Sequence, residues 1–156
     1  MPSPRPSPPR SPEPPHGRQA PAGPARVLVA EDNPVNQILA REMITVLGFE
    51  PVLTSDGQEA VATLERDRRF ALVLLDCQMP VMDGVEAARR IRAHESARGL
   101  PRLPVVALTA SVSREDRDRC LASGMDDFMS KPFTLAELRT VLGRWLSAPV
   151  TASGQA

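Results

Sequence analysis

Carboxylate, hydroxyl and ammonium side chains follow closely after four short apolar runs of this 156-residue sequence. Glu31 and Asp32 come after the first run, Asp76 after another, Thr109 after a third and Lys131 after the last. Carboxylates that are brought close together repel one another and raise one another's pKa unless a cation neutralises them. Mg²⁺ suits that role because it prefers oxygen ligands and is held by one or two carboxylates plus a substrate phosphate. The pattern therefore predicts a magnesium site, if the fold brings these residues together.

Asp76 has the chemistry of a phosphoryl acceptor. A carboxylate can attack phosphorus to give an aspartyl phosphate, and the transfer needs mainly positioning and neutralisation of the equatorial oxygens. Mg²⁺ would neutralise one oxygen and Lys131 another, while the hydroxyl of Thr109 would donate to a third. The small side chain of Ala110 leaves room for a phosphoryl donor to approach.

Lys131 is distinguished by composition as well as by position. The chain has 19 basic residues, and all of them except Lys131 are arginines. An ammonium is a compact point charge, whereas a guanidinium is a flat fork. The single lysine is therefore a hint that a point charge is required at this position, although chance alone also has to place one lysine somewhere.

Each of these residues also has an ordinary structural explanation when it is taken alone. Glu31 and Asp32 could cap the helix that follows them, because acids favour helix N-termini. Asp76 could be a turn residue, Thr109 could satisfy backbone groups at a strand end, and Lys131 could be a solvated side chain. Their joint placement after successive apolar runs favours the functional interpretation.

The apolar runs alternate with stretches of helical periodicity. Strands are predicted at 27–30, 51–54, 71–75, 105–108 and 127–129, and helices at 35–47, 55–66, 83–94, 113–122 and 134–146. Gly48 is placed to end the first helix, and Thr134 with Glu137 has the pattern of a capping box for the last.

Regular β-α alternation indicates a parallel sheet with helices on both faces. The predicted fold class is therefore α/β, a five-stranded parallel doubly wound sheet of flavodoxin-like order 2-1-3-4-5 flanked by five helices. In such sheets the ligand lies beyond the carboxyl ends of the strands, which is where all the candidate residues fall.

Composition divides the chain into one domain and two tails. Residues 1–25 contain 10 of the 17 prolines and no Leu, Ile, Val or Phe, so they are expected to be a disordered Pro-rich tail or linker. Residues 26–147 are predicted to form the domain, and residues 148–156 a disordered C-terminal tail.

Charge and hydropathy exclude several classes of protein. The formal net charge is zero, which gives no reason to expect binding to nucleic acid or to an anionic membrane. No apolar run approaches the roughly 18–20 residues of a membrane span, and the N-terminus lacks the apolar region of a signal peptide. The last helix is followed by about ten residues, too few for a helix-turn-helix.

The cysteine content favours a reducing, cytoplasmic location. Cys77 and Cys120 have no metal-ligand spacing and form no disulfide framework in the sequence. Cys77 is interpreted as a buried, inert thiol, because nothing basic adjoins it in the sequence.

Four segments of the sequence resemble the receiver domains of response regulators. They are residues 29–33 (VAEDN), 75–84 (LDCQMPVMDG), 106–110 (VALTA) and 127–133 (DFMSKPF). Within that family the chain is most similar to the receivers of hybrid sensor histidine kinases, through residues 31–37 (EDNPVNQ) and 124–127 (GMDD). The resemblance covers residues 26–146 and implies a two-component phosphorelay receiver, which catalyses only its own phosphorylation and dephosphorylation.

The resemblance assigns the acidic residues to phosphorylation and metal binding. Asp76 would be the phosphorylated residue. Asp32, Asp76 and the backbone carbonyl of Gln78 would bind Mg²⁺, and Glu31 would act mainly through water.

The resemblance assigns the remaining residues to phosphoryl contact and switching. Thr109 and Lys131 would contact the phosphoryl group, and the Lys131–Pro132 peptide would be cis. Phe128 would move inward when Thr109 shifts, which would switch the face formed by the predicted helix 113–122, strand 127–129 and helix 134–146. A static core position is the alternative for Phe128.

The implied partner is a histidine kinase or a histidine phosphotransfer protein, with a helical phosphohistidine donor docked beside the first predicted helix. Val35 and Ile38 lie on the face that borders the predicted pocket. The stripe of this helix assigned to the core consists of Leu39, Ala40, Met43 and Leu47. The sequence gives no indication of oligomeric state.

Two other functions are alternatives to that of a receiver. A phosphatase resembling the haloacid dehalogenases also uses an aspartyl nucleophile, Mg²⁺ and a lysine, but it requires a second Asp where this chain has Gln78. A flavin-binding module would require a Gly-rich or hydroxyl-rich phosphate loop after the first strand, where this chain has Glu31 and Asp32.

Overall fold

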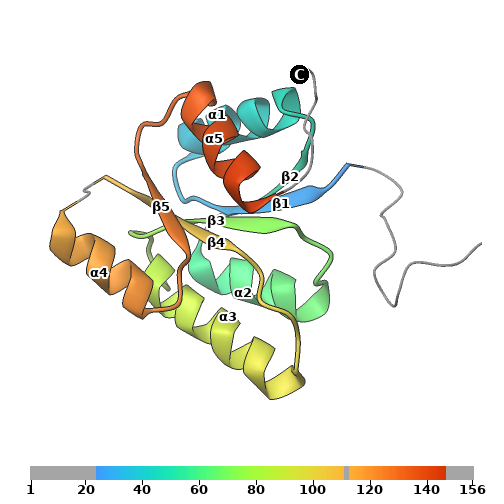
Figure 1. Ribbon diagram of the computed structural model, residues 1–156, viewed down its shortest axis with the longest axis vertical. Helices are drawn as coiled ribbons and strands as arrows, with labels where there is room; N and C mark the ends of the chain where they lie inside the picture. Colours follow the sequence, from blue (N-terminus) through green and yellow to red (C-terminus); the bar gives the residue numbers. More distant parts are fainter. Residues whose placement is uncertain (1–23, 111–112, 147–156) are drawn as a thin grey trace, which may run out of the picture.

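The computed structural model of the chain describes residues 24–110 and 113–146. Five β-α units follow one another along these residues (Figure 1). Their elements are β1 Arg26–Ala30, α1 Pro34–Val46, β2 Glu50–Thr54, α2 Gly57–Arg66, β3 Leu72–Asp76, α3 Gly84–Arg98, β4 Val105–Thr109, α4 Arg114–Ala122, β5 Asp127–Ser130 and α5 Leu135–Trp145. The five strands were predicted to within one residue at each end.

Helix α3 is longer than the sequence pattern predicted. It was expected to end near His94, but it continues for another turn to Arg98. Gly99 then ends the helix in the left-handed conformation, with φ of 64°, which glycine adopts without steric cost. The Arg98–Gly99 pair was therefore the C-terminal signal.

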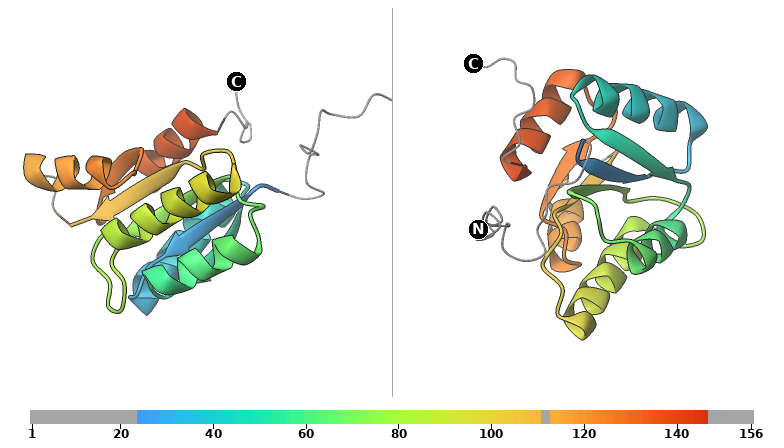
Figure 2. Two further views of the ribbon diagram at one scale, coloured as in Figure 1. Left: turned by 90° about the horizontal axis from the view of Figure 1, so that it is seen from below. Right: turned by 90° about the vertical axis from the view of Figure 1, so that its right-hand side faces the viewer.

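The strands form one parallel sheet in the order β2-β1-β3-β4-β5, as predicted. Helices α1 and α5 cover one face of the sheet, and α2, α3 and α4 cover the other. The right-hand view of Figure 2 shows α1 and α5 on one side of the strands and α2 and α3 on the other. Because all strands are parallel, their carboxyl ends meet at one edge of the sheet.

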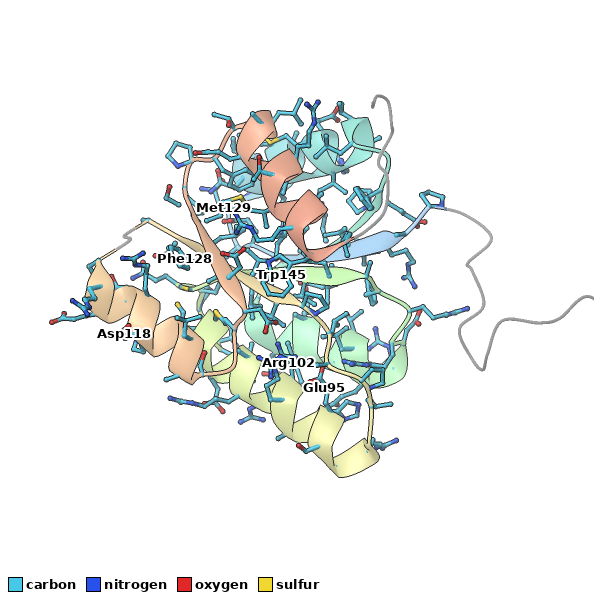
Figure 3. The ribbon with its side chains drawn as sticks, viewed as in Figure 1. Glu95, Arg102, Asp118, Phe128, Met129 and Trp145 are labelled. Atoms are coloured by element: carbon cyan, nitrogen blue, oxygen red, sulfur yellow. The ribbon has the colours of Figure 1, made fainter. Side chains whose placement is uncertain are left out.

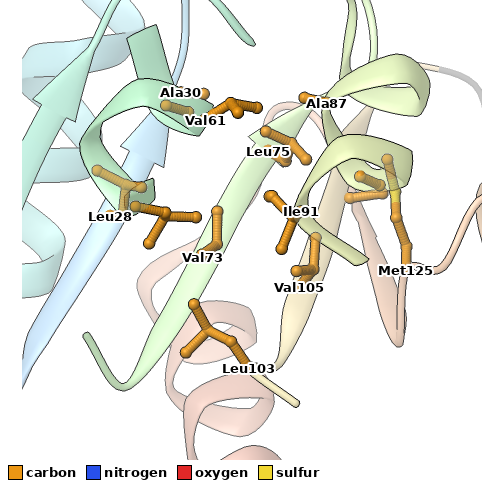
Figure 4. Packing of buried hydrophobic residues seen from close by; sticks show 14 of the residues in the cluster. Leu28, Ala30, Val61, Val73, Leu75, Ala87, Ile91, Leu103, Val105 and Met125 are labelled. Atoms are coloured by element: carbon orange, nitrogen blue, oxygen red, sulfur yellow. The ribbon is translucent and has the colours of Figure 1, made fainter. Parts of the chain in front are cut away.

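The side chains of each strand alternate between two cores. On β1 and β3, Leu28 and Val73 pack toward α2 and α3 (Figure 4), whereas Val27 and Leu72 pack toward α1 and α5. The continuous apolar run of β3 is explained by this burial on both faces. The central strand that ends in Asp76 is thus fixed on both sides.

One assignment on α1 is wrong. Leu39 was placed in the core stripe, but its side chain is 49% exposed. The buried residues of the helix are Ala40 and Ile44, four positions apart, and one helical step of about 100° turns Leu39 away from them. We use the term α1 apolar face for the exposed residues Val35, Ile38, Leu39 and Val46.

The two predicted tails lie almost wholly outside the described residues. Ala25, which was assigned to the N-terminal tail, belongs to the fold, because its carbonyl accepts a hydrogen bond from the N–H of Glu50 at 2.8 Å. Among the helices of the described residues, none has the length and apolar character needed to cross a membrane.

Candidate active site

A cavity of about 330 Å³ lies at the carboxyl ends of β1, β3 and β5. It is lined by Glu31, Asp32, Asn33, Pro34, Asn36, Asp76, Gln78, Ala110 and Lys131. The fold thus brings together the acidic residues and the single lysine that the sequence singled out, although they are up to 100 residues apart in the chain.

Asp76 is the last residue of β3 and is 3% exposed. One carboxylate oxygen, Oδ2, accepts a hydrogen bond from Lys131 Nζ at 2.9 Å. The other, Oδ1, accepts one from the backbone N–H of Gln78 at 3.1 Å. The carboxylate is therefore held in one orientation at the base of the cavity.

Glu31 is also buried, at 2% exposure. Its Oε1 accepts from Lys131 Nζ at 3.2 Å, and its Oε2 accepts from the N–H of Asn33 and the Nδ2 of Asn36. With both oxygens engaged by protein donors, this carboxylate is less available than its neighbour to bind a cation directly.

Asp32 differs from the two buried carboxylates. It is exposed at the mouth of the cavity, and within residues 24–110 and 113–146 it makes no hydrogen bond or ion pair. It does not cap the following helix, because the side chain of Asn33 accepts from the N–H groups of Val35 and Asn36 and so occupies the N-cap. The simple capping explanation for Glu31 and Asp32 therefore fails.

Lys131 joins the two buried carboxylates. Burial lowers the pKa of its ammonium, but the hydrogen bond and charge of Asp76 and the charge of Glu31 raise it more, so the net shift is upward. The side chain is thus a fixed cation at neutral pH. Its backbone N–H donates to the carbonyl of Thr109 at 2.8 Å, and its peptide bond to Pro132 is cis, as the resemblance implied.

The cluster carries more negative than positive charge. Ligand atoms of Glu31, Asp32 and Asp76 lie within 4.8 Å of one another, and Lys131 supplies one positive charge against their three. Like charges this close destabilise the site unless a cation balances them. The atoms that could bind a metal ion are all oxygens, so the arrangement fits a hard divalent cation such as Mg²⁺.

Thr109 lies beside the cavity, and Phe128 lies on the neighbouring strand β5. Thr109 is the buried last residue of β4, and Ala110, the next residue, lines the cavity. Phe128 is half-buried on β5, on the opposite face from Met129 (Figure 3). The guanidinium of Arg117 lies 5.1 Å from the centre of the Phe128 ring, so the ring is partly covered by this side chain.

The sequence interpretation missed residues that position the site. Gln37 donates from Nε2 to the carbonyl of Glu31 at 2.7 Å, and Asn36 contacts the carboxylate of the same residue. A Cβ added to Gly84 would lie 2.4 Å from the carbonyl oxygen of Asp76, so only glycine allows α3 to start this close to β3. The sequence pattern placed the Asp83–Gly84 pair at a helix start and within the 75–84 segment, but it did not predict this close contact.

Comparison with known proteins identifies the architecture. The family described as the response regulator receiver domain matches residues 27–143, which is more than half of the chain. The chain belongs to the response regulator receiver family. The predicted family, fold class and place in two-component phosphorelay signalling are thereby confirmed.

Curated relatives of this receiver are sensor kinases. The sensor protein GacS of Pseudomonas syringae is 41% identical over 120 residues, which are 77% of this chain and 13% of that protein. Hybrid signal transduction histidine kinase A of Dictyostelium discoideum is 37% identical over 127 residues, which are 81% of this chain and 6% of that kinase. This receiver therefore spans only a small part of these relatives.

Two solved structures are informative about the site. The receiver domain of sensor histidine kinase PA1611 from Pseudomonas aeruginosa is 45% identical, with a TM-score of 0.72 over 81% of this chain and 100% of that one. That structure has a magnesium ion in its active site cleft. The receiver domain of Ssk1 from Saccharomyces cerevisiae, solved with the histidine phosphotransfer protein Ypd1, is 32% identical, with a TM-score of 0.75 over 83% and 93% of the two chains.

Proposed function

We propose that this receiver accepts a phosphoryl group on Asp76 from a phosphohistidine donor in a Mg²⁺-dependent reaction. The observation that carries the proposal is the position of Lys131 Nζ, which lies between Asp76 Oδ2 and Glu31 Oε1 while Asp32 faces the cavity mouth without a partner. A nucleophile, a fixed cation and an oxygen-ligand site are thus gathered in one cavity.

The chain's own residues supply the positioning and part of the charge neutralisation. A carboxylate oxygen of Asp76 attacks phosphorus as the bond from phosphorus to the imidazole nitrogen breaks, and the released imidazole takes a proton from solvent. The ammonium of Lys131 is placed to balance charge on one phosphoryl oxygen. The hydroxyl of Thr109 can donate to another, and Ala110 leaves the approach open.

The acidic residues would hold the metal ion. Asp32, Asp76 and the backbone carbonyl of Gln78 are assigned as direct ligands, and Glu31 acts through water because both of its oxygens already accept hydrogen bonds. A bound Mg²⁺ would supply charge neutralisation for the phosphoryl oxygens. The magnesium ion in the PA1611 receiver supports this assignment.

The phosphohistidine donor is proposed to dock on the α1 apolar face. This face starts at the helix N-terminus, directly after Asp32, and includes Ile38, which is 49% exposed. The partner is a histidine kinase or a histidine phosphotransfer protein, and the Ssk1 receiver solved with Ypd1 shows that a relative binds the second of these.

Phosphorylation is proposed to switch the face made of α4, β5 and α5. Thr109 would move toward the phosphoryl group, and Phe128 would follow into the space that it leaves. Phe128 is half-buried and lies under Arg117, so an inward movement changes the surface that α4 and β5 present.

The activity is proposed to be limited to the receiver's own phosphorylation and dephosphorylation in the cytoplasm. Gln78 is exposed at the position where a phosphatase resembling the haloacid dehalogenases has its acid-base Asp, and an amide cannot transfer that proton.

Intact-mass measurement tests the acceptor assignment. After incubation with acetyl phosphate and Mg²⁺, the wild-type chain should gain the mass of one phosphoryl group, and Asp76→Asn should gain none. Omission of Mg²⁺ should prevent the gain in the wild type. Undiminished labelling of Asp76→Asn would show that another residue is the acceptor.

A further inference from the structure

The structure brings the two cysteines of this chain together. Cys77 Sγ lies 3.3 Å from Cys120 Sγ, although the residues are 43 positions apart. Both are free thiols and both are buried, at 7% and 2% exposure. Sequence spacing gave no reason to pair them.

The pair connects two elements with different roles. Cys77 directly follows Asp76 at the end of β3, and Cys120 lies on α4. Cys120 is the only buried residue of α4, and the neighbouring Leu121 is 48% exposed. This helix lies at the margin of the molecule (Figure 1), and Cys120 is the side chain through which it enters the buried core cluster.

We propose that Cys77 and Cys120 form a reversible intramolecular disulfide, which makes this pair a redox modification site and fixes α4 against the strand end that carries Asp76. The two sulfurs have to approach by only about 1.2 Å to reach bonding distance. The two sulfur atoms are already in contact, so a small shift brings them within bonding distance.

Hydrogen peroxide is the oxidant class that fits the site. The sulfur of Cys120 attacks one peroxide oxygen, the O–O bond breaks, and the products are a sulfenic acid and water. The sulfur of Cys77 then attacks the Cys120 sulfur, the S–S bond forms, and the oxygen leaves as a second water with the Cys77 proton. Two thiols and one peroxide thus give one disulfide and two waters, and a dithiol reductant reverses the step.

Two features favour oxidation of the pair by a small molecule. Cys77 borders an open pocket of about 440 Å³ that Arg119 also lines. The hydrogen bond between the two thiols lowers the pKa of Cys120 against the opposing effect of burial, with help from the Arg119 guanidinium, and it raises the pKa of Cys77. Cys120 is therefore the thiol that ionises first and the attacking species.

The disulfide would restrain the switching face. This consequence rests on the proposed function, because it assumes that α4 has to move when Asp76 is phosphorylated. With Cys120 bonded to Cys77, α4 could no longer move independently of β3. Oxidation would therefore make the receiver less responsive to its phosphoryl donor.

Peroxide titration of the full chain tests the modification itself. The reduced protein, freed of reductant, should lose the mass of two hydrogen atoms, and proteolysis should yield one cross-linked peptide that contains both cysteines. Dithiothreitol should restore the original mass. The oxidised form should also melt several degrees higher, because the cross-link closes a long loop of the unfolded chain.

Cys77→Ser and Cys120→Ser serve as controls, because either variant can only gain oxygen or dimerise. The proposal is overturned if the wild type gains oxygen alone, forms disulfide-linked dimers, or keeps two free thiols under conditions that oxidise free glutathione.

A second measurement separates the consequence from the proposed function. Labelling by acetyl phosphate should be several-fold slower for the oxidised chain than for the reduced chain, and Cys120→Ala, which controls for methionine oxidation, should be labelled equally before and after peroxide. Equal labelling of both wild-type forms refutes the restraint on α4. Failure of both forms to be labelled would instead contradict the proposed function and leave the mass result standing.

Discussion

Asp32→Asn should stabilise the metal-free protein while it removes the response to Mg²⁺. The substitution keeps the shape of the side chain and deletes one of three negative charges. Asp32 has no partner among the described residues to lose, whereas it is repelled by Glu31 and Asp76, whose nearest carboxylate oxygens lie within 4.8 Å of its own. The metal-free site therefore tolerates this charge at a cost.

The size of that cost can be estimated from the distances. Two unit charges 4.8 Å apart repel by about 0.9 kcal/mol at the dielectric constant of water, which suits an exposed side chain. Two such repulsions act on Asp32, and the attraction of Lys131 cancels at most about one of them. The expected gain is therefore roughly 1 kcal/mol at low ionic strength, or a rise in Tm of about 3–5 °C.

Thermal unfolding with EDTA and with Mg²⁺ provides the assay. At a Mg²⁺ concentration ten times its Kd, the wild type should gain about 1.4 kcal/mol from metal binding, and Asp32→Asn should gain much less. The order of the two Tm values should therefore reverse between EDTA and Mg²⁺. The control variant Glu65→Gln, which removes an exposed charge from α2, should show no such reversal of Tm relative to the wild type.

Two results would refute the reasoning. If Asp32→Asn is less stable than the wild type in EDTA, the cluster is not under electrostatic strain. If the variant keeps the full stabilisation by Mg²⁺, the metal does not bind where the carboxylates converge.

Three further predictions concern Lys131, the contact between Gly84 and Asp76, and the docking face. Lys131→Arg should slow acetyl phosphate labelling on the order of 10²-fold, because the longer, planar guanidinium places its charge differently from the compact ammonium that lies between the two buried carboxylates. Labelling at the wild-type rate would show that a point charge is not required at this position. Gly84→Ala should lower the free energy of unfolding by about 1–3 kcal/mol. Gly143→Ala, at a position on α5 with open space around it, should raise that free energy by about 0.5–1 kcal/mol. Denaturant titration measures both changes, and equal effects of the two substitutions would contradict the close contact at Gly84. Ile38→Glu should slow transfer from a phosphohistidine protein by roughly tenfold, about 1.4 kcal/mol, without changing acetyl phosphate labelling; equal loss with both donors would assign Ile38 to the fold.

The sequence contained most of the fold because the alternation of β3 and its neighbours is unambiguous. Buried parallel strands read as continuous apolar runs, and side chains after each run must converge at one edge of the sheet. Asp76 and Lys131 could therefore be placed together from order alone. The orientation of Leu39 could not be predicted in the same way. Leu39 and Ala40 are adjacent on the helix and both are apolar, so the sequence does not show which of them faces the core.

Side-chain contacts between different helices and strands could not be predicted from the spacing of residues in the sequence. The separation of Cys77 from Cys120 depends on how far α4 lies from β3, which the period of neither element encodes. The different environments of the carboxylates could not be predicted from spacing either. Glu31 and Asp32 are neighbours in the chain, yet Glu31 is buried with both oxygens hydrogen-bonded, whereas Asp32 is exposed and has no partner among the described residues. Asn33 takes the N-cap of α1, so Asp32 is not engaged in capping this helix, which the residue types alone did not reveal.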